Sequence, residues 1–165
     1  MSAETTSILS ETTKERIELW LAKFPTDQRR SAVIGALTVA QEQNGGWLSP
    51  EIMEAVAEHL RIPAAWVFEV GTFYSLFHLE PVGRHKVAIC DNISCMLCGA
   101  DKIVSHVEAK LGIKRGQTTE DGRITLVQEE ECLAACCGAP MMIVDGHYHE
   151  NLTPEKVDEI LDGLE

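Results

Sequence analysis

Six cysteines are the residues best suited to chemistry, and all of them fall between positions 90 and 137. They are Cys90, Cys95, Cys98, Cys132, Cys136 and Cys137. Disulfides that stabilise a secreted protein are usually spread along the chain, whereas clustered cysteines in a reducing compartment indicate metal binding or redox chemistry. The sequence therefore predicts a metal or redox centre in the second half of the chain.

Four of these cysteines form two closely spaced pairs, each after an apolar run typical of a buried strand. Cys90 and Cys95 are a C-x4-C pair, and Cys132 and Cys136 are a C-x3-C pair. If the two strands are neighbours, their loops lie side by side at one edge of a sheet and the four thiolates converge. Each iron of a [2Fe–2S] cluster takes two protein ligands besides two bridging sulfides. The spacing therefore favours such a cluster and a one-electron carrier.

Cys98 leaves a second ligand set open. Cys90, Cys95, Cys98 and Cys132 spell the C-x4-C-x2-C…C pattern of plant-type ferredoxins, which would leave Cys136 unused. The plant-type loop is usually rich in small residues and is presented by a β-grasp fold. Here the loop contains three large apolar side chains and a helical stripe follows it, so we favour the two-pair arrangement.

Two further interpretations involve the same cysteines. Cys95 and Cys98 form a C-x-x-C at a strand-to-helix junction, which in a thioredoxin-like fold is typical of a thiol-disulfide oxidoreductase. Pro140 precedes a strand, as the cis-proline of that fold does. Dithiol chemistry, however, would not need the other ligand candidates. Zinc is the other alternative, although a zinc ribbon needs two C-x2-C knuckles and only one is present.

The first half of the chain shows helical periodicity. Apolar residues recur at i, i+3, i+4 and i+7 over 17–24 and again over 33–40. Ser49-Pro50 is an N-cap followed by proline, which begins a third helix, and Pro63 begins a fourth. We expect a helical region over 1–80, and we expect the tryptophans, at positions 20, 47 and 66, to pack in its core.

The second half has a mixed pattern that begins after a break at 79–83. The expected strands are 86–90, 124–127, 141–144 and 147–150, and the expected helices carry stripes over 103–111 and 157–164. Asp145-Gly146 is a strong hairpin signal between the last two strands. The predicted fold is α+β: an N-terminal helical region, 1–80, followed by a thioredoxin-like mixed-sheet domain, 81–165.

Composition excludes some functions. The formal net charge of −12 argues against nucleic acid as a partner, because a phosphate backbone needs a basic face. The N-terminus lacks the basic and apolar regions of a signal peptide, and the longest apolar stretches are too short to span a bilayer. We expect a soluble, cytosolic protein that reaches a membrane only through its partners.

Several segments occur together in an order and spacing that resemble one family. They are Gly71-Thr72-Phe73-Tyr74, Pro81-Val82-Gly83-Arg84-His85, the C-x4-C of Cys90 and Cys95, Gly116-Gln117-Thr118-Thr119-Glu120-Asp121-Gly122-Arg123, Cys132-Leu133-Ala134-Ala135-Cys136 and Ala139-Pro140-Met141-Met142. The chain resembles the E subunit of bacterial NADH–quinone oxidoreductase, or respiratory complex I, from about the second helix to the C-terminus.

The resemblance implies a helical N-terminal region, a thioredoxin-like ferredoxin domain and a [2Fe–2S] cluster. It assigns Cys90 and Cys95 to one iron and Cys132 and Cys136 to the other. The implied partners are a flavoprotein that binds FMN and NADH, and other proteins of the peripheral arm. The chain would accept single electrons from the flavin in NADH oxidation coupled to quinone reduction, on the cytoplasmic side of the inner membrane. It shows no Gly-rich dinucleotide fingerprint of its own.

Other interpretations remain beside this one. The same module occurs in NAD-linked hydrogenases and formate dehydrogenases, which differ in their partners, and a free-standing ferredoxin would not need the helical region. His147 and His149 share one face of a strand and are interpreted as an exposed hairpin arm rather than a metal site. The acidic run Glu129–Glu131 precedes Cys132, and we expect its charge to lower the reduction potential.

Overall fold

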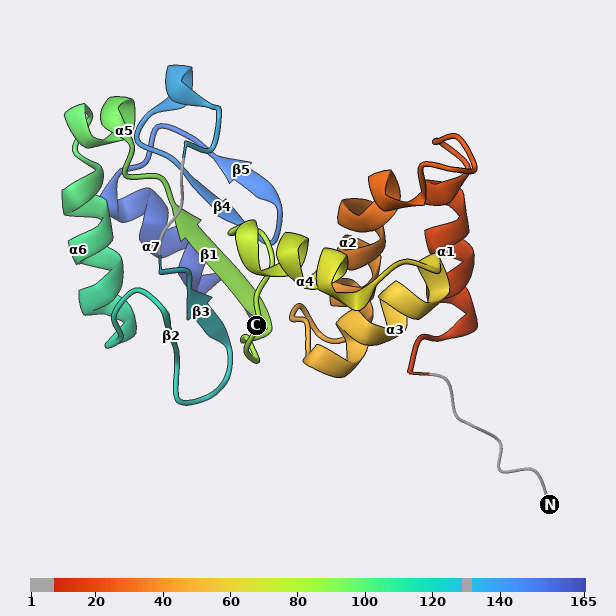
Figure 1. Ribbon diagram of the computed structural model, residues 1–165. Coiled ribbons are helices and arrows are strands. Elements are labelled where there is room, and N and C mark those ends of the chain that lie inside the picture. The colour runs from red at the N-terminus through yellow and green to blue at the C-terminus, as the bar shows by residue number, and fades with distance from the viewer. Residues whose placement is uncertain (1–7, 129–131) are drawn as a thin grey trace. The chain divides into compact units, whose positions relative to one another are not determined.

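The computed structural model describes residues 8–128 and 132–165, and the chain divides into two compact units (Figure 1). The first unit ends at Pro81 and the second is Val82–Glu165. The acidic run Glu129–Glu131, expected to lower the reduction potential, lies outside the described residues. Over the part of the chain that is described, none of the helices has the length and apolar character needed to cross a membrane.

The first unit is a group of helices around its own apolar core. The helices are α1 (Glu11–Leu21), α2 (Val33–Gln43), α3 (Pro50–Leu60) and α4 (Ala64–Phe73), with a 3-10 turn at Arg29–Ala32 before α2. The predicted helices are therefore confirmed, although α1 ends at Leu21 and the stripe residue Phe24 lies beyond it. Ile17, Leu37 and Leu60 are among the fully buried side chains of this core.

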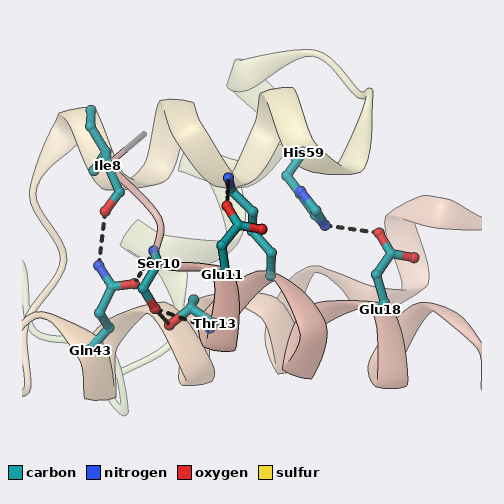
Figure 2. Close-up of polar contacts among 8 residues, drawn as sticks. Ile8, Ser10, Glu11, Thr13, Glu18, Gln43 and His59 are labelled. Atoms are coloured by element: carbon teal, nitrogen blue, oxygen red, sulfur yellow. Dashed lines mark hydrogen bonds and ion pairs between the residues drawn. The ribbon is translucent and has the colours of Figure 1, made fainter. Parts of the chain in front are cut away.

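Side-chain caps explain where α1 and α3 begin. Ser10 Oγ accepts a hydrogen bond from the Thr13 N–H at the start of α1, and Ser49 Oγ accepts one from the Ile52 N–H at the start of α3. Figure 2 shows that Gln43, at the end of α2, holds the segment before α1 with both ends of its amide. These contacts fix the α1 start against the α2 end.

The tryptophans do not all pack as expected. Trp20 and Trp47 are half-buried rather than central, and Trp66 is 38% exposed. The Arg30 guanidinium lies 4.7 Å from the Trp66 ring, and Lys23 lies 3.5 Å from the Trp20 ring. Expecting all three in the core was therefore wrong for Trp66, because its ring lies on the surface as the partner of a cation.

The second unit is built on a mixed sheet with the strand order β2-β3-β1-β4-β5 (Figure 1). The strands are β1 (His85–Ile89), β2 (Gln117–Thr118), β3 (Ile124–Leu126), β4 (Met142–Val144) and β5 (His147–His149). β1 and β3 are parallel, and all the other pairs are antiparallel. Asp145 and Gly146 take φ of 50° and 84°, which gives the predicted hairpin turn.

The described part of the second unit also contains the α-helices α5 (Ile93–Leu97), α6 (Ala100–Leu111) and α7 (Pro154–Asp162). α6 and α7 lie side by side, joined by a contact of 2.8 Å between His106 and Asp158. They cover a core shared with the sheet, which includes Val87, Val107, Leu126, Met142, Val157 and Leu161. The α+β class and the mixed sheet are as predicted, whereas β2 and α5 were not predicted.

Candidate metal centre

Both cysteine pairs leave the sheet at the same edge. β1 and β3 pair in parallel with Val87 opposite Leu126, so the chain leaves both strands at their carboxyl ends on one side. Cys90 directly follows β1, and Cys132 lies in the segment after β3. The expectation that these two strands are neighbours is confirmed. The order of the sheet therefore brings together two loops that lie far apart in the sequence.

The first loop is held mainly by backbone contacts. The Cys90 N–H donates to the Met141 carbonyl at 3.1 Å, which ties the loop to the segment before β4. Asn92 Oδ1 accepts from the Ile93 N–H at 2.8 Å and caps α5, the helix that carries Cys95. Cys90 and Cys95 are 2% and 1% exposed. The first pair thus points into the protein rather than into solvent.

Cys95 is in a strongly perturbed setting. Burial and the neighbouring Cys90 sulfur raise the pKa of the Cys95 thiol to about 11, while a hydrogen bond from the Met141 N–H acts in the opposite direction. Cys136 also lies close enough to add to this rise in the pKa. Iron binds the thiolate, so loading this site must displace a tightly held proton.

The second loop carries a close sulfur pair. Cys132 Sγ and Cys136 Sγ are 3.7 Å apart, and both residues are exposed. Leu133, between them, is buried beside Cys90 and Cys95 and anchors the loop. Ala134 takes a φ of +59°, a left-handed conformation that is uncommon for alanine. The loop therefore turns sharply between its two thiols.

The end of the second loop rests on the segment after β5. The Asn151 N–H donates to the Gly138 carbonyl at 2.6 Å, and the Leu152 N–H donates to the Pro140 carbonyl at 2.9 Å. A Cβ on Gly138 would come within 2.5 Å of the Glu150 side chain. This close approach explains the glycine directly after the cysteine-bearing turn.

Contacts link all four candidate ligands. Cys90 forms a hydrogen bond with Cys95, Cys136 lies close enough to Cys95 to affect its pKa, and Cys132 lies beside Cys136. Over residues 8–128 and 132–165, no three His, Cys, Asp or Glu side chains are arranged around a single ion. In a [2Fe–2S] cluster each iron needs only two cysteine ligands, and the two thiol pairs fit that donor set.

The extra thiols are placed differently. Cys98 is exposed at the C-cap of α5, and Cys137 is exposed in the short 3-10 turn Cys136–Gly138. All six cysteines are free thiols in the structure. His147 is exposed and His149 half-buried on β5, as expected of a hairpin arm.

The contacts of two residues, Met141 and Arg115, with the site were not foreseen from the sequence. The Met141 backbone touches both Cys90 and Cys95, and Arg115 forms an ion pair with Asp91, the residue after Cys90. No spacing pattern signals either contact, because each joins segments far apart in the sequence.

A family model described as thioredoxin-like [2Fe-2S] ferredoxin matches residues 17–165, which include both cysteine pairs. The chain belongs to this family. The thioredoxin-like ferredoxin domain that the motifs imply is thus confirmed, and this ferredoxin has the fold class expected of it. Family membership makes it a [2Fe–2S] electron-transfer module.

Curated relatives match this ferredoxin over most of their length. The NADH-quinone oxidoreductase E subunit numbered 2, from Rhizobium meliloti (strain 1021), is 46% identical over 153 residues, which cover 93% of this chain and 89% of the relative. The NADH-quinone oxidoreductase E subunit of Rickettsia typhi (strain ATCC VR-144 / Wilmington) is 38% identical, and the match covers 98% of this chain and 96% of the relative.

A solved structure shares the fold of this ferredoxin at lower identity. It is the NAD+-reducing [NiFe]-hydrogenase in the air-oxidized state, with a TM-score of 0.63 and 20% identity. The match covers 76% of this ferredoxin and 22% of the hydrogenase chain. This ferredoxin therefore corresponds to about a fifth of that longer chain, and the likeness concerns the fold.

Proposed function

We propose that this ferredoxin is the E subunit of an NADH–quinone oxidoreductase and that Cys90, Cys95, Cys132 and Cys136 hold its [2Fe–2S] cluster. When bound, such a cluster takes up and releases one electron at a time. The electron comes from the flavin of a partner protein that binds FMN and NADH. The complex, with the other proteins of the peripheral arm, holds the ferredoxin on the cytoplasmic side of the inner membrane.

One observation carries the ligand assignment: two thiol pairs from separate loops meet at a single sheet edge. The first pair is buried and the second is exposed, with 3.7 Å between Cys132 Sγ and Cys136 Sγ. The buried pair excludes water from one side of the site, and the exposed pair leaves the other side open to a partner. Support for the complex comes from relatives that bear the name of its E subunit.

The protein supplies the polar surroundings of the site. The Met141 N–H donates to the Cys95 sulfur, and such hydrogen bonds stabilise the thiolate and raise the reduction potential. Because burial raises the pKa of Cys95, its thiol must lose a tightly held proton before iron binds, so cluster loading should be favoured at higher pH. The residues around the sulfurs therefore control both loading and potential.

The test is cluster chemistry on purified protein. After iron-replete, anaerobic expression, we expect equal iron and sulfide, and a low-temperature EPR signal of S = ½ after reduction with dithionite. Cys136→Ser should lose this signal, whereas the matched Cys137→Ser and Cys98→Ser variants should keep it. A signal that dies with Cys98→Ser and survives Cys136→Ser would replace the proposed ligands with the plant-type set.

A second assignment is favoured by the shared fold with the NAD+-reducing hydrogenase. In that case the same electron-transfer module would serve a nickel-containing complex. Affinity purification from the native host distinguishes the two: a flavoprotein recovered with quinone-reducing activity supports the NADH–quinone oxidoreductase, and one recovered with nickel supports the hydrogenase.

A further inference from the structure

We propose that Arg115 positions the first cysteine loop and that its charge raises the reduction potential by neutralising Asp91. The inference rests on the proposed function, because it takes Cys90 as a cluster ligand. Asp91 directly follows Cys90, and Arg115 Nη1 donates to Asp91 Oδ2 at 2.5 Å. Neither residue belongs to the proposed ligand set.

Arg115 is itself held in place by α6 and β3. Glu108 Oε1 accepts from the Arg115 N–H at 3.3 Å, and Glu108 Oε2 accepts from Lys114 Nζ at 2.7 Å. These two cationic neighbours hold the pKa of Glu108 below its usual range. The next residue, Gly116, donates its N–H to the Leu126 carbonyl at 2.7 Å. The backbone at Arg115 is thus fixed, and its side chain is directed to Asp91.

The three residues that open the loop are each fixed by a different contact. Cys90 donates to the Met141 carbonyl, Asp91 accepts from Arg115, and Asn92 caps α5 through the Ile93 N–H. The Arg115 contact is the only one of these three that involves two full charges. It therefore has an electrostatic consequence as well as a geometric one.

The sign of that consequence follows from the charge of the added electron. A carboxylate beside a ligand cysteine disfavours reduction, and a guanidinium on that carboxylate offsets the effect. Removing the Arg115 charge leaves Asp91 uncompensated and lowers the potential. Removing the Asp91 charge leaves Arg115 uncompensated and raises it. If the ion pair had a purely structural role, removing either partner would not shift the reduction potential in opposite directions.

The size of the effect is limited by solvent. The Arg115 and Asp91 side chains are 33% and 36% exposed, so water and salt screen their charges. We expect each single variant to change the ratio of oxidised to reduced cluster at a fixed potential by at most about tenfold. For a one-electron couple, tenfold corresponds to about 59 mV. The changes should shrink at high ionic strength.

The experiment is an EPR-monitored redox titration of the full chain with its cluster. Arg115→Gln should lower the midpoint potential, Asp91→Asn should raise it, and the double variant should lie near the wild type. Arg115→Lys keeps the charge and should move the potential little. Asp162→Asn, in the ion pair of Lys110 with Asp162 between α6 and α7, is the matched control and should leave the potential unchanged.

The outcomes separate the inference from the function on which it rests. A wild-type chain without the EPR signal overturns both. With the signal present, a lowered potential in Arg115→Gln and a raised one in Asp91→Asn support the inference, and any other pair of shifts, or no shift, overturns it. If Arg115→Gln does not retain a cluster, Asp91→Asn decides alone: a raised potential supports the role of the charge pair, and an unchanged one overturns it.

Discussion

Ala134 has a left-handed backbone, with φ of +59°, between the two exposed thiols of the second loop. A Cβ in this region clashes with the following carbonyl and costs about 1–2 kcal/mol. Glycine has no such clash, although it costs more entropy on folding. The chain therefore stores strain at the turn that brings Cys132 and Cys136 together, as is common near functional sites.

We predict that Ala134→Gly raises the free energy of unfolding of the purified protein by about 0.5–1 kcal/mol, because the relief of strain exceeds the entropy of the glycine. Ala135→Gly is the matched control: the φ of Ala135 is −121°, outside the left-handed region, so glycine there relieves no left-handed clash and should only destabilise. Urea unfolding of both variants measures the difference. Equal destabilisation by the two would contradict the assignment of strain to Ala134.

At the level of single residues, the sequence identified the thiols but not their surroundings. The C-x4-C and C-x3-C pairs were visible as spacings, because each pair lies within one loop. The contact of Arg115 with Asp91 and the contact of Met141 with Cys95 join loops that only the folded sheet brings together. Such contacts have no periodic or local signature in one sequence.

At the level of elements, His85 joins the start of β1 to the turn between β4 and β5. His85 Nδ1 lies 2.6 Å from Asp145 Oδ2, and Nε2 lies 2.9 Å from the Glu165 carbonyl. The hydrogen bond with Asp145, followed by that with Glu165, raises the pKa of His85 above 6.5. Folding therefore strengthens proton binding by His85, which makes stability depend on pH.

We predict that the contribution of His85 to the free energy of unfolding is fully present below about pH 6.5, the ordinary pKa of histidine. It is lost as the pH rises through the raised pKa of His85. Burial lowers the pKa of His149, so the contribution of His149 to the free energy of unfolding depends on pH in the opposite sense and is lost as the pH falls. The unfolding free energy of the wild type minus that of His85→Gln, measured from about pH 5.5 to about pH 8.5, isolates His85. A difference that grows with pH would contradict the predicted sign.

Elements with local signals were predicted well, and those without were not. Ser49-Pro50 signals a helix cap and Asp145-Gly146 signals a turn, and both signals are confirmed in the structure. β2 is only Gln117–Thr118 and forms because it pairs with β3. α5 is only Ile93–Leu97, which is too short for a repeating helical pattern of apolar residues to be recognised in the sequence. Tertiary contacts, rather than propensity, decide such short elements.

At the level of the whole molecule, each unit has a core of its own. The first core is formed by α1 to α4 and the second by the sheet with α6 and α7. The break predicted at 79–83 from composition contains the boundary between Pro81 and Val82. We propose that the two units are domains that unfold separately, since a domain with its own core can fold alone.

Gly35 provides a substitution that acts on the first unit alone. A Cβ on this α2 residue would lie 2.2 Å from the ring of Trp20 on α1, so alanine forces either the Trp20 ring or the helices to shift. Overpacking of this kind costs about 1–3 kcal/mol. Helix propensity alone would instead make glycine to alanine favourable by about 1 kcal/mol. The sign of the change therefore reports whether the Trp20 contact exists.

We predict two thermal transitions for the cluster-loaded chain, because its two cores are separate. Gly35→Ala should lower only the transition of the first unit, and removing iron with a chelator should lower only that of the second, since bound cluster stabilises the folded state alone. Differential scanning calorimetry, with loss of cluster absorbance recorded in parallel, assigns each transition.

Gly35→Ala combined with Trp20→Ala is the control and should recover part of the lost stability. A single transition that moves with both changes would mean that the units unfold as one cooperative domain, against the separate cores.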